Sequence, residues 1–279
     1  GLIAFESHFP DRFFDVGIAE QHAVTFAAGL AMNGMRPVVA LYSTFLNRAW
    51  DQLVYDVALH RLPVIFCLDR AGITGDDGPS HHGVYDMALL SKVPGMRVLA
   101  PSSAQDLQQM LHDAMSLADT GPVVIRYPKG NARQVAECDV GAGLNARRMA
   151  TDPAKALCIL AVGKMVGAAE KAVAALAQGG IAATLWDVRS CVPADDAMIR
   201  DAAEHRRVIT LEDGIRDGGI GFLLADAITS VAPAAVPVIK VLGLPTRFIP
   251  HAKPDVILAK LGLDAAGIER AAREMLALP

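Results

Sequence analysis

Short apolar runs alternate with amphipathic stretches along most of the chain, a pattern typical of alternating strands and helices. Residues 62–69 (LPVIFCLD) form a continuous apolar run, as expected of a parallel strand buried on both faces. Residues 44–60 follow a helical repeat instead, with Phe45 and Ala49 among its apolar positions. Further strands are predicted at residues 37–43, 96–103, 121–130, 156–163, 181–189, 206–213 and 236–243.

Repeated strand–helix units predict parallel sheets with right-handed crossovers, and therefore an α/β fold. The alternation is lost over residues 134–150, which we interpret as a linker. We therefore expect two parallel-sheet domains, at residues 1–133 and 151–279, which agrees with the length of the chain.

Composition narrows the class of protein. The chain is 52% hydrophobic with a net charge of -4 and a pI near 6.1, which argues against a nucleic-acid or anionic-membrane partner. No apolar run approaches the roughly 18 residues of a membrane span, and no signal peptide is visible. The four cysteines are scattered without a CxxC pair, which predicts free thiols in a cytoplasmic protein. Because the chain opens at Gly1 without a methionine, we expect a fragment or one piece of a cut chain.

Candidate chemistry gathers in the loops that follow strands, because ligands of open α/β sheets bind at the carboxyl ends of the strands. Residues 69–86 (DRAGITGDDGPSHHGVYD) form a long, polar, glycine-rich loop, the profile of a functional loop. Arg48, Arg70 and Arg126 lie at or beside strand ends, and arginine suits a phosphate or carboxylate. Glu20 opens an otherwise apolar helix, where an acid is either a favoured helix-end charge or a reactive group.

Some of these patterns have plainer interpretations. Residues 76–78 fit an ordinary turn. His81 and His82 are adjacent and lack partners at helical spacing, so no metal site is predicted. Residues 212–221 (EDGIRDGGIG) match a dinucleotide-binding loop only superficially, and we interpret them as a tight strand-to-helix turn.

The order of the motifs is more specific than any one of them. DVGIAEQHAVTFAAGLAMNGMRPVVALYSTFLNRAWDQ is followed by LDRAGITGDDGPSHHGVYD, RYPKG, LEDGIRDGGIG and GLPTRFIPH. In this order the sequence resembles the 1-deoxy-D-xylulose-5-phosphate synthase family, thiamine-diphosphate enzymes related to transketolases. The resemblance spans essentially the whole chain and implies a transketolase-like pyrimidine-binding domain followed by a transketolase C-terminal-like domain.

The resemblance implies a role for each candidate side chain. In this family the acid of IAEQ, here Glu20, hydrogen-bonds the N1′ nitrogen of the cofactor's aminopyrimidine ring and so promotes loss of the thiazolium C2 proton. Phe45 would stack on that ring, and Arg48 would border the same cleft. The other implied side chains are Tyr42, Arg70 and Arg126 around the acceptor aldehyde and its phosphate, and Asp77 and His81 as groups that orient substrate and transfer protons.

The implied reaction joins pyruvate and D-glyceraldehyde 3-phosphate, with loss of carbon dioxide, to give 1-deoxy-D-xylulose 5-phosphate. The family's diphosphate and Mg²⁺ are held by an N-terminal domain with a GDG…N motif, which this sequence does not contain. The chain should therefore be inactive without that domain, and its first domain should lack a strand and a helix. Val192 stands where a lysine is expected, which puts any role of that position in doubt.

Two other functions remain open on the sequence. The chain could be the beta-type subunit of a 2-oxo acid dehydrogenase or of a split transketolase, although SHHG and GLPTRFIPH favour the synthase. It could also be a non-catalytic assembly module. The joint presence of five candidate residues argues against that, namely Glu20, Phe45, Arg70, His81 and Arg126. The resemblance implies a homodimer, and the nearly all-apolar segments 23–34 and 223–236 suit helices covered on several sides.

Overall fold

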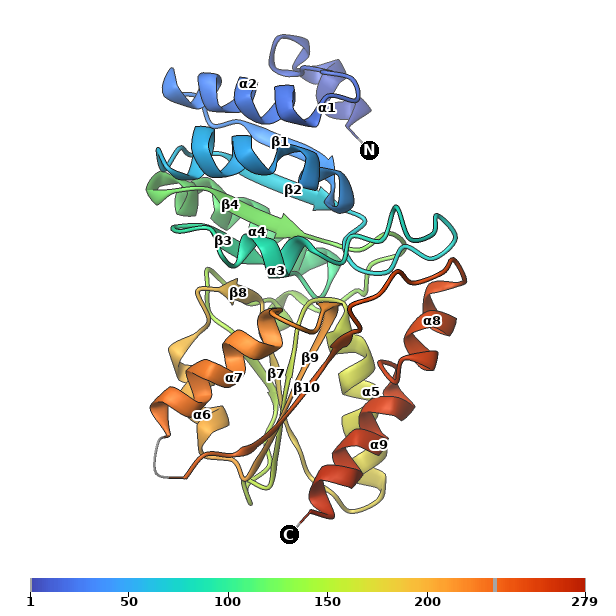
Figure 1. The fold of residues 1–279 in the computed structure, drawn as a ribbon. Helices are drawn as coiled ribbons and strands as arrows, with labels where there is room; N and C mark the ends of the chain where they lie inside the picture. Colours follow the sequence, from blue (N-terminus) through green and yellow to red (C-terminus); the bar gives the residue numbers. More distant parts are fainter. Residues whose placement is uncertain (1, 233–234, 279) are drawn as a thin grey trace.

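The computed structural model describes residues 2–232 and 235–278 as two α/β units stacked one above the other (Figure 1). Each unit is built around a five-stranded sheet. The strands are β1 (Val38–Tyr42), β2 (Ile65–Asp69), β3 (Arg97–Leu99), β4 (Val123–Arg126), β5 (Arg147–Ala150), β6 (Leu157–Ala161), β7 (Thr184–Asp187), β8 (Ser190–Val192), β9 (Arg207–Ile215) and β10 (Val238–Leu244).

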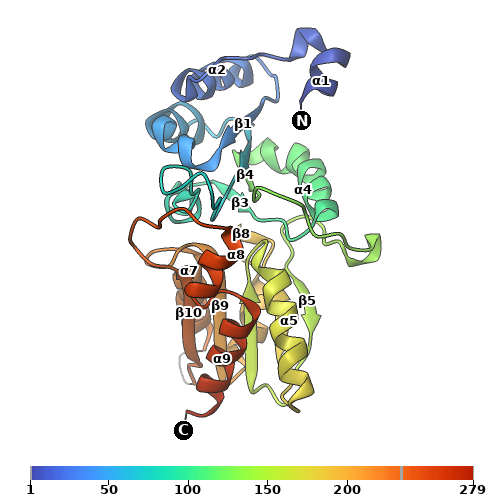
Figure 2. The same ribbon diagram turned by 90° about the vertical axis from the view of Figure 1, so that its right-hand side faces the viewer.

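The helices lie on both faces of the sheets (Figure 2). The α-helices are α1 (Ile3–His8), α2 (Glu20–Met32), α3 (Asp86–Leu90), α4 (Ala104–Leu117), α5 (Met165–Gln178), α6 (Asp196–Ala203), α7 (Ile220–Val231), α8 (Pro254–Lys260) and α9 (Ala265–Leu276). The 3₁₀ helices of the described residues are η1 (Pro10–Arg12), η2 (Ser43–Ala49), η4 (Ala118–Thr120) and η5 (Glu137–Asp139), and η3 (Gln52–Ala58) is a π-helix.

The sheet topology confirms the α/β class and corrects its detail. The first sheet has the order β1-β2-β4-β3-β8 and the second the order β10-β9-β6-β7-β5, and neighbouring strands are parallel except at β8 and β5. Both sheets are therefore mixed rather than purely parallel. Strand β5 falls inside the expected linker, residues 134–150. A strand of this length at a sheet edge is too short to show a hydrophobic period in the sequence.

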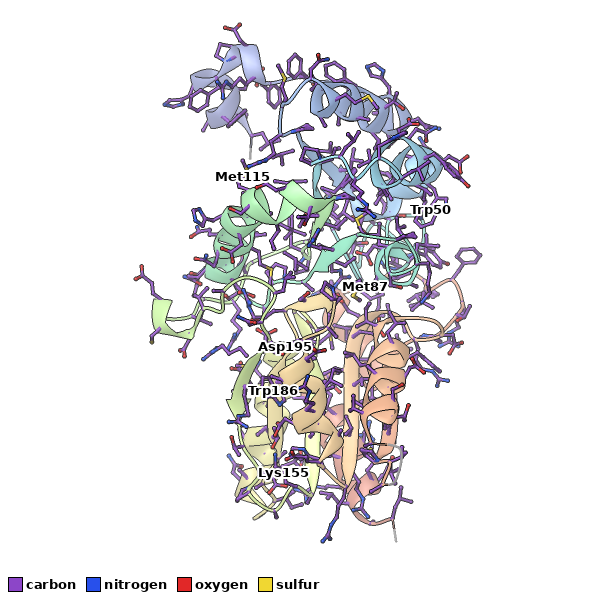
Figure 3. All side chains as sticks on the ribbon, turned by 90° about the vertical axis from the view of Figure 1, so that its left-hand side faces the viewer. Trp50, Met87, Met115, Lys155, Trp186 and Asp195 are labelled. Atoms are coloured by element: carbon purple, nitrogen blue, oxygen red, sulfur yellow. The ribbon has the colours of Figure 1, made fainter. Side chains whose placement is uncertain are left out.

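The two units share a strand and a hydrophobic core. Strand β8 follows β7 of the second sheet in the chain but pairs with β3 of the first. One buried cluster runs from Val24 of α2 through Met87 to Leu224 of α7. Met87 lies at the junction of the units (Figure 3), and its Sδ is 4.0 Å from Sγ of Cys191. The cysteines are free, as predicted.

Residues 44–60 differ from the expected α-helix. They begin as the 3₁₀ helix η2. After a short α-helical stretch that begins at Trp50, they continue as the π-helix η3. The 3₁₀ winding places residues three apart on one face. Elsewhere local prediction holds, since the Ser103 hydroxyl caps α4 by accepting a hydrogen bond from the Asp106 amide at 3.0 Å.

Arg126, at the end of β4, joins the two units through buried charges. Its Nε lies 3.0 Å from Oδ2 of Asp86, at the start of α3, and its Nη1 lies 2.5 Å from Oδ1 of Asp213 in β9. Burial opposes ionisation of Asp213, but Arg126 and then Lys164 outweigh it and hold the pKa of that carboxyl below its usual value. The two units are therefore tied by a charge cluster from which water is excluded.

A second buried arginine ties the units from the other side. Arg189 donates from Nε to Asp106 Oδ1 at 2.8 Å and from Nη1 to the carbonyl oxygen of Asn145 at 2.6 Å. Asp106 belongs to the first unit and Arg189 to the second. Together with Arg126 this contact fixes how one unit sits on the other.

The Arg126→Met variant should lose about 3–5 kcal/mol of unfolding free energy, because it leaves Asp86 and Asp213 buried without a counter-charge. Urea unfolding at constant pH measures the loss. The control is Arg36→Met, which breaks the exposed pair with Asp119 and should cost about 1 kcal/mol or less. Equal, small losses of unfolding free energy for both variants would contradict the role of Arg126 in joining the two units.

Candidate active site

Glu20 begins helix α2 and is only 5% exposed. Its Oε2 has no hydrogen-bond partner within residues 2–232 and 235–278, and the nearest cation, Arg48 Nη1, is 3.7 Å away. Small apolar residues such as Ala23 and Ala27 pack α2 onto η2 and η3, and this packing draws the first turn inward. A buried oxygen without a partner costs about 1–3 kcal/mol. Glu20 Oε2 is thus free to accept a hydrogen bond from a donor outside the described residues.

Tyr42, the last residue of β1, and Phe45 in η2 form a stacked pair. Their ring centroids are 5.7 Å apart with planes at 19°. The ring of His81 meets Phe45 edge-on at 5.4 Å and 75°. Arg48 lies over Phe45 at 5.7 Å, as the three-residue repeat of η2 requires. Since Arg48 also faces Glu20, the acid and the aromatic pair border the same surface.

Two cations hold Asp77 in the 69–86 loop. Arg70 lies 4.1 Å above the Tyr42 ring and donates from Nη1 to Asp77 Oδ2 at 3.1 Å, and Lys129 Nζ donates to the same oxygen at 2.9 Å. The Lys129 hydrogen bond, supported by the charge of Arg70, lowers the pKa of Asp77 below its usual value. The Asp77 carboxylate therefore stays ionised at neutral pH, and His81, with Ser80 Oγ 2.9 Å from its Nδ1, lies nearby in the same loop.

Lys129 is a site residue that sequence reasoning did not single out. It lies in RYPKG, just after the end of β4. Its position at a strand end is therefore the same signal that pointed to the arginines. The contact with Asp77 depends on the path of the 69–86 loop, which the sequence does not specify.

Arg126 does not join this cluster, and the geometry does not support its expected contact with a substrate phosphate. Its side chain is 2% exposed, and its guanidinium is engaged by Asp86 and Asp213. Its Nη2 has no hydrogen-bond partner within the described residues, but it is buried, so a phosphate would have to open this cluster to reach it. Val192, where a lysine was expected, pairs in β8 with Val98 at the edge of the first sheet.

The structure brings the remaining candidates together in one row, which runs from an acid beside an aromatic face to a cationic end. An acid with a free buried oxygen and an aromatic ring on the same surface fit a planar, hydrogen-bonding heterocycle. The cationic end fits an anionic group. The members of the row are Glu20, Arg48, Phe45, Tyr42, His81, Arg70, Asp77 and Lys129.

The described parts of the chain offer neither a cluster of metal ligands nor a membrane-spanning helix. Residues 2–232 and 235–278 contain no group of three or more His, Cys, Asp or Glu side chains placed to hold a metal ion. None of the helices in those ranges has the length and apolar character needed to cross a membrane.

Comparison with known families assigns both units. Residues 1–134 match the transketolase pyrimidine binding domain, and residues 148–268 match the transketolase C-terminal domain. Among solved structures, a split-gene transketolase described as an inactive beta4 tetramer superposes with a TM-score of 0.86 at 28% identity, over 98% of this chain and 87% of that one. A transketolase variant from Pichia stipitis, 16% identical with a TM-score of 0.75 over 92% of this chain and 37% of that one, shares the fold.

Curated relatives narrow the family further. The 1-deoxy-D-xylulose-5-phosphate synthases of Thermobifida fusca and Paraburkholderia phymatum are each 46% identical, over 99% and 98% of this chain. That of Chlorobium luteolum is 45% identical over 100% of it. The chain spans 44%, 43% and 44% of these relatives, less than half of their length. It therefore belongs to the 1-deoxy-D-xylulose-5-phosphate synthase family of transketolase-like proteins, with a pyrimidine-binding and a C-terminal domain.

Proposed function

We propose that this chain supplies the pyrimidine and acceptor side of a thiamine-diphosphate site that condenses pyruvate with D-glyceraldehyde 3-phosphate. Carbon dioxide is lost, and the product is 1-deoxy-D-xylulose 5-phosphate. The observation that carries the proposal is the buried, unpartnered Oε2 of Glu20, which faces Arg48 at 3.7 Å, while the same arginine lies over the ring of Phe45. The names of the relatives support the choice of substrates.

The residues at the Glu20 end fit the aminopyrimidine half of the cofactor. Thiamine diphosphate, when bound, supplies the carbanion chemistry of the reaction. Glu20 would share a proton with the N1′ nitrogen, and Phe45 would hold the ring by stacking. The cofactor's diphosphate and Mg²⁺ would be held by a diphosphate-binding domain that acts together with this chain. Without that domain the chain would not turn over.

The cationic end fits the phosphorylated aldehyde. Arg70 and Lys129 offer donors for its phosphate, while Asp77 keeps both cations in place. His81, beside Phe45, would move a proton at the carbonyl oxygen of the acceptor. Tyr42 would exclude water from the space between the two ends.

A second candidate is one subunit of a split enzyme, because the similar solved chain is a split-gene transketolase that this chain covers almost completely. In that arrangement a separate chain would carry the diphosphate-binding domain. An assay with pyruvate and glyceraldehyde phosphate distinguishes the synthase from a transketolase, which would need a ketose phosphate donor. A lipoyl acceptor in place of the aldehyde tests a 2-oxo acid dehydrogenase.

The Glu20→Gln variant should fold normally and lose about 10²–10⁴-fold in kcat, because an amide cannot share a proton with N1′. Turnover by the chain combined with a diphosphate-binding domain measures the loss. Glu170→Gln, which changes a half-buried acid paired with Arg133, is the matched control and should retain activity. Near-normal turnover by Glu20→Gln would contradict the proposed sharing of a proton between Glu20 and N1′.

The Arg70→Ala variant should raise KM for the phosphorylated aldehyde about 10- to 150-fold and leave KM for pyruvate nearly unchanged, because it removes a charge-assisted phosphate contact. Steady-state kinetics with each substrate varied in turn gives both values. Arg148→Ala removes a similar arginine, stacked 5.6 Å from the Trp186 ring, and should change neither. Equal increases for both substrates would reject the phosphate role.

We also propose that two copies of the chain associate through its N-terminal segment, residues 2–18. Neither α1 nor η1 buries a residue, and Ile3 is 76% exposed. The apolar residues of α2 and α7 are covered only in part within the chain, since Met32, Phe222 and Val231 are 63%, 43% and 51% exposed. Residues 233–234 of the segment 223–236 lie outside the described residues.

Sedimentation across a concentration series should show a dimer, and Ile3→Glu should weaken it because the variant places a charge in an apolar contact. Val256→Glu, at an exposed position of α8, is the control and should leave the dimer intact. A monomer at micromolar concentration contradicts the proposal.

A further inference from the structure

The GLPTRFIPH motif distinguishes the sequence, yet no step of the proposed reaction uses it. The motif covers residues 243–251, from the end of β10 into the 244–254 segment, which connects β10 to α8 and runs beside the 69–86 loop (Figure 1). The gap left between the two, lined by His82, Val84 and Ile249 among others, measures about 10 Å³. A gap of this size is at the lower limit for one water molecule, so the segments are packed against each other.

The ends of the 69–86 loop are anchored in the core of the second domain. Ile73 and Val84 are 2% and 6% exposed and belong to the hydrophobic cluster that contains Leu244 and Ile249. The amide of Ile215 donates to the Val84 carbonyl oxygen at 2.9 Å. The loop belongs to the first domain by sequence, but its apolar side chains are buried by the second.

Glycines allow this close approach. Gly72 and Gly75 have φ of +74° and +88°, which other residues rarely adopt. A Cβ on Gly72 would lie 1.9 Å from Asp213 Oδ2, and one on Gly75 would lie 2.6 Å from Pro254 Cδ. Two separate points of the loop therefore touch the second domain without space for a side chain.

His82 is the buried polar side chain at this contact: it lines the gap beside Ile249, bonds Thr74 of its own loop through Nδ1, and has no hydrogen-bond partner for Nε2 among the residues that the structure describes. It is 3% exposed, and its Nδ1 accepts a hydrogen bond from the Thr74 amide at 3.2 Å across the base of the loop. Burial lowers the pKa of His82, and the backbone of Ile249 and Pro250 offsets this only in part. A neutral imidazole suits the acceptor role at Nδ1. The neighbouring His81 lies instead against Phe45, so the two histidines serve opposite sides of the loop.

We propose that the 244–254 segment of the second domain positions the acceptor-binding loop, with His82 as the positioning residue through which it acts. The contact keeps the loop in the shape that presents Asp77 to Arg70 and His81 to Phe45. The identity of the acceptor rests on the proposed function, whereas the positioning itself does not.

Hydrogen exchange of the chain, followed by mass spectrometry, tests the positioning without catalysis. His82→Leu removes the acceptor at similar volume and should speed exchange of the Thr74 amide and its neighbours in residues 72–84 about tenfold or more. His82→Asn keeps an acceptor near the position of Nδ1 and should restore much of the protection. Ile249→Ala loosens the same contact from the other side and should act in the same direction, even if His82→Leu does not fold.

His205→Leu is the matched control. His205 is 2% exposed and bonds Thr184 and Asp201 within the second domain, so its loss destabilises the chain without touching the loop. Exchange in residues 72–84 should stay unchanged. Equal acceleration by His205→Leu, or none by His82→Leu and Ile249→Ala, overturns the proposal.

Kinetics of the chain combined with a diphosphate-binding domain complete the test. Ile249→Ala should raise KM for the phosphorylated aldehyde about tenfold and change KM for pyruvate less than about twofold, because only the acceptor loop is loosened. Parallel rises in both constants would overturn the link between loop and acceptor. If the wild type makes no product while the exchange results hold, the proposed function fails and the positioning of the loop stands.

Discussion

The guanidinium of Arg126, buried between Asp86 and Asp213, is the constraint on which the rest of the structure depends. It lies at the end of β4, where the first sheet meets β9 of the second. Buried ion pairs are weak evidence for net stability, but breaking one leaves an uncompensated charge, so such a pair permits few alternative arrangements. The shared strand β8 and the buried Arg189 likewise limit how the two domains can be arranged relative to each other. The two domains thus form one scaffold for the 69–86 loop.

That scaffold explains how a long glycine-rich loop can carry reactive groups at fixed distances. The loop is polar where it faces the Tyr42–Phe45 pair and apolar at Ile73 and Val84, where the second domain covers it. A site of this kind needs side chains held to within a fraction of an ångström, which loops achieve only with support from their surroundings. Here the support comes from a domain that contributes no residue to the row itself.

Much of the fold could be predicted from the sequence, because it depends on local pattern. The parallel strands follow from continuous apolar runs, and the Ser103 cap follows from one hydroxyl before a helix. The short edge strands β5 and β8 escaped prediction because they carry no period of their own. The 3₁₀ and π winding of residues 43–58 escaped it as well, since the apolar spacing also fits an α-helix.

The site was predictable where a motif carries the chemistry and unpredictable where tertiary contacts decide. Glu20, Phe45 and His81 came from recognisable motifs and are brought together. Arg126 has the residue type and strand-end position of an anion ligand, but the charges that bury it come from distant segments. Lys129 shows the reverse, since only the loop fold brings it to Asp77.

In the function proposed above, the free buried oxygen of Glu20 is reserved for the aminopyrimidine of thiamine diphosphate. A crystal structure of the chain assembled with a diphosphate-binding domain and the cofactor tests it most directly. Glu20 Oε2 should lie within about 2.6–3.2 Å of the N1′ nitrogen, with the aminopyrimidine ring stacked on Phe45. A cofactor bound with N1′ facing any other group, and Glu20 still unpartnered, would contradict it.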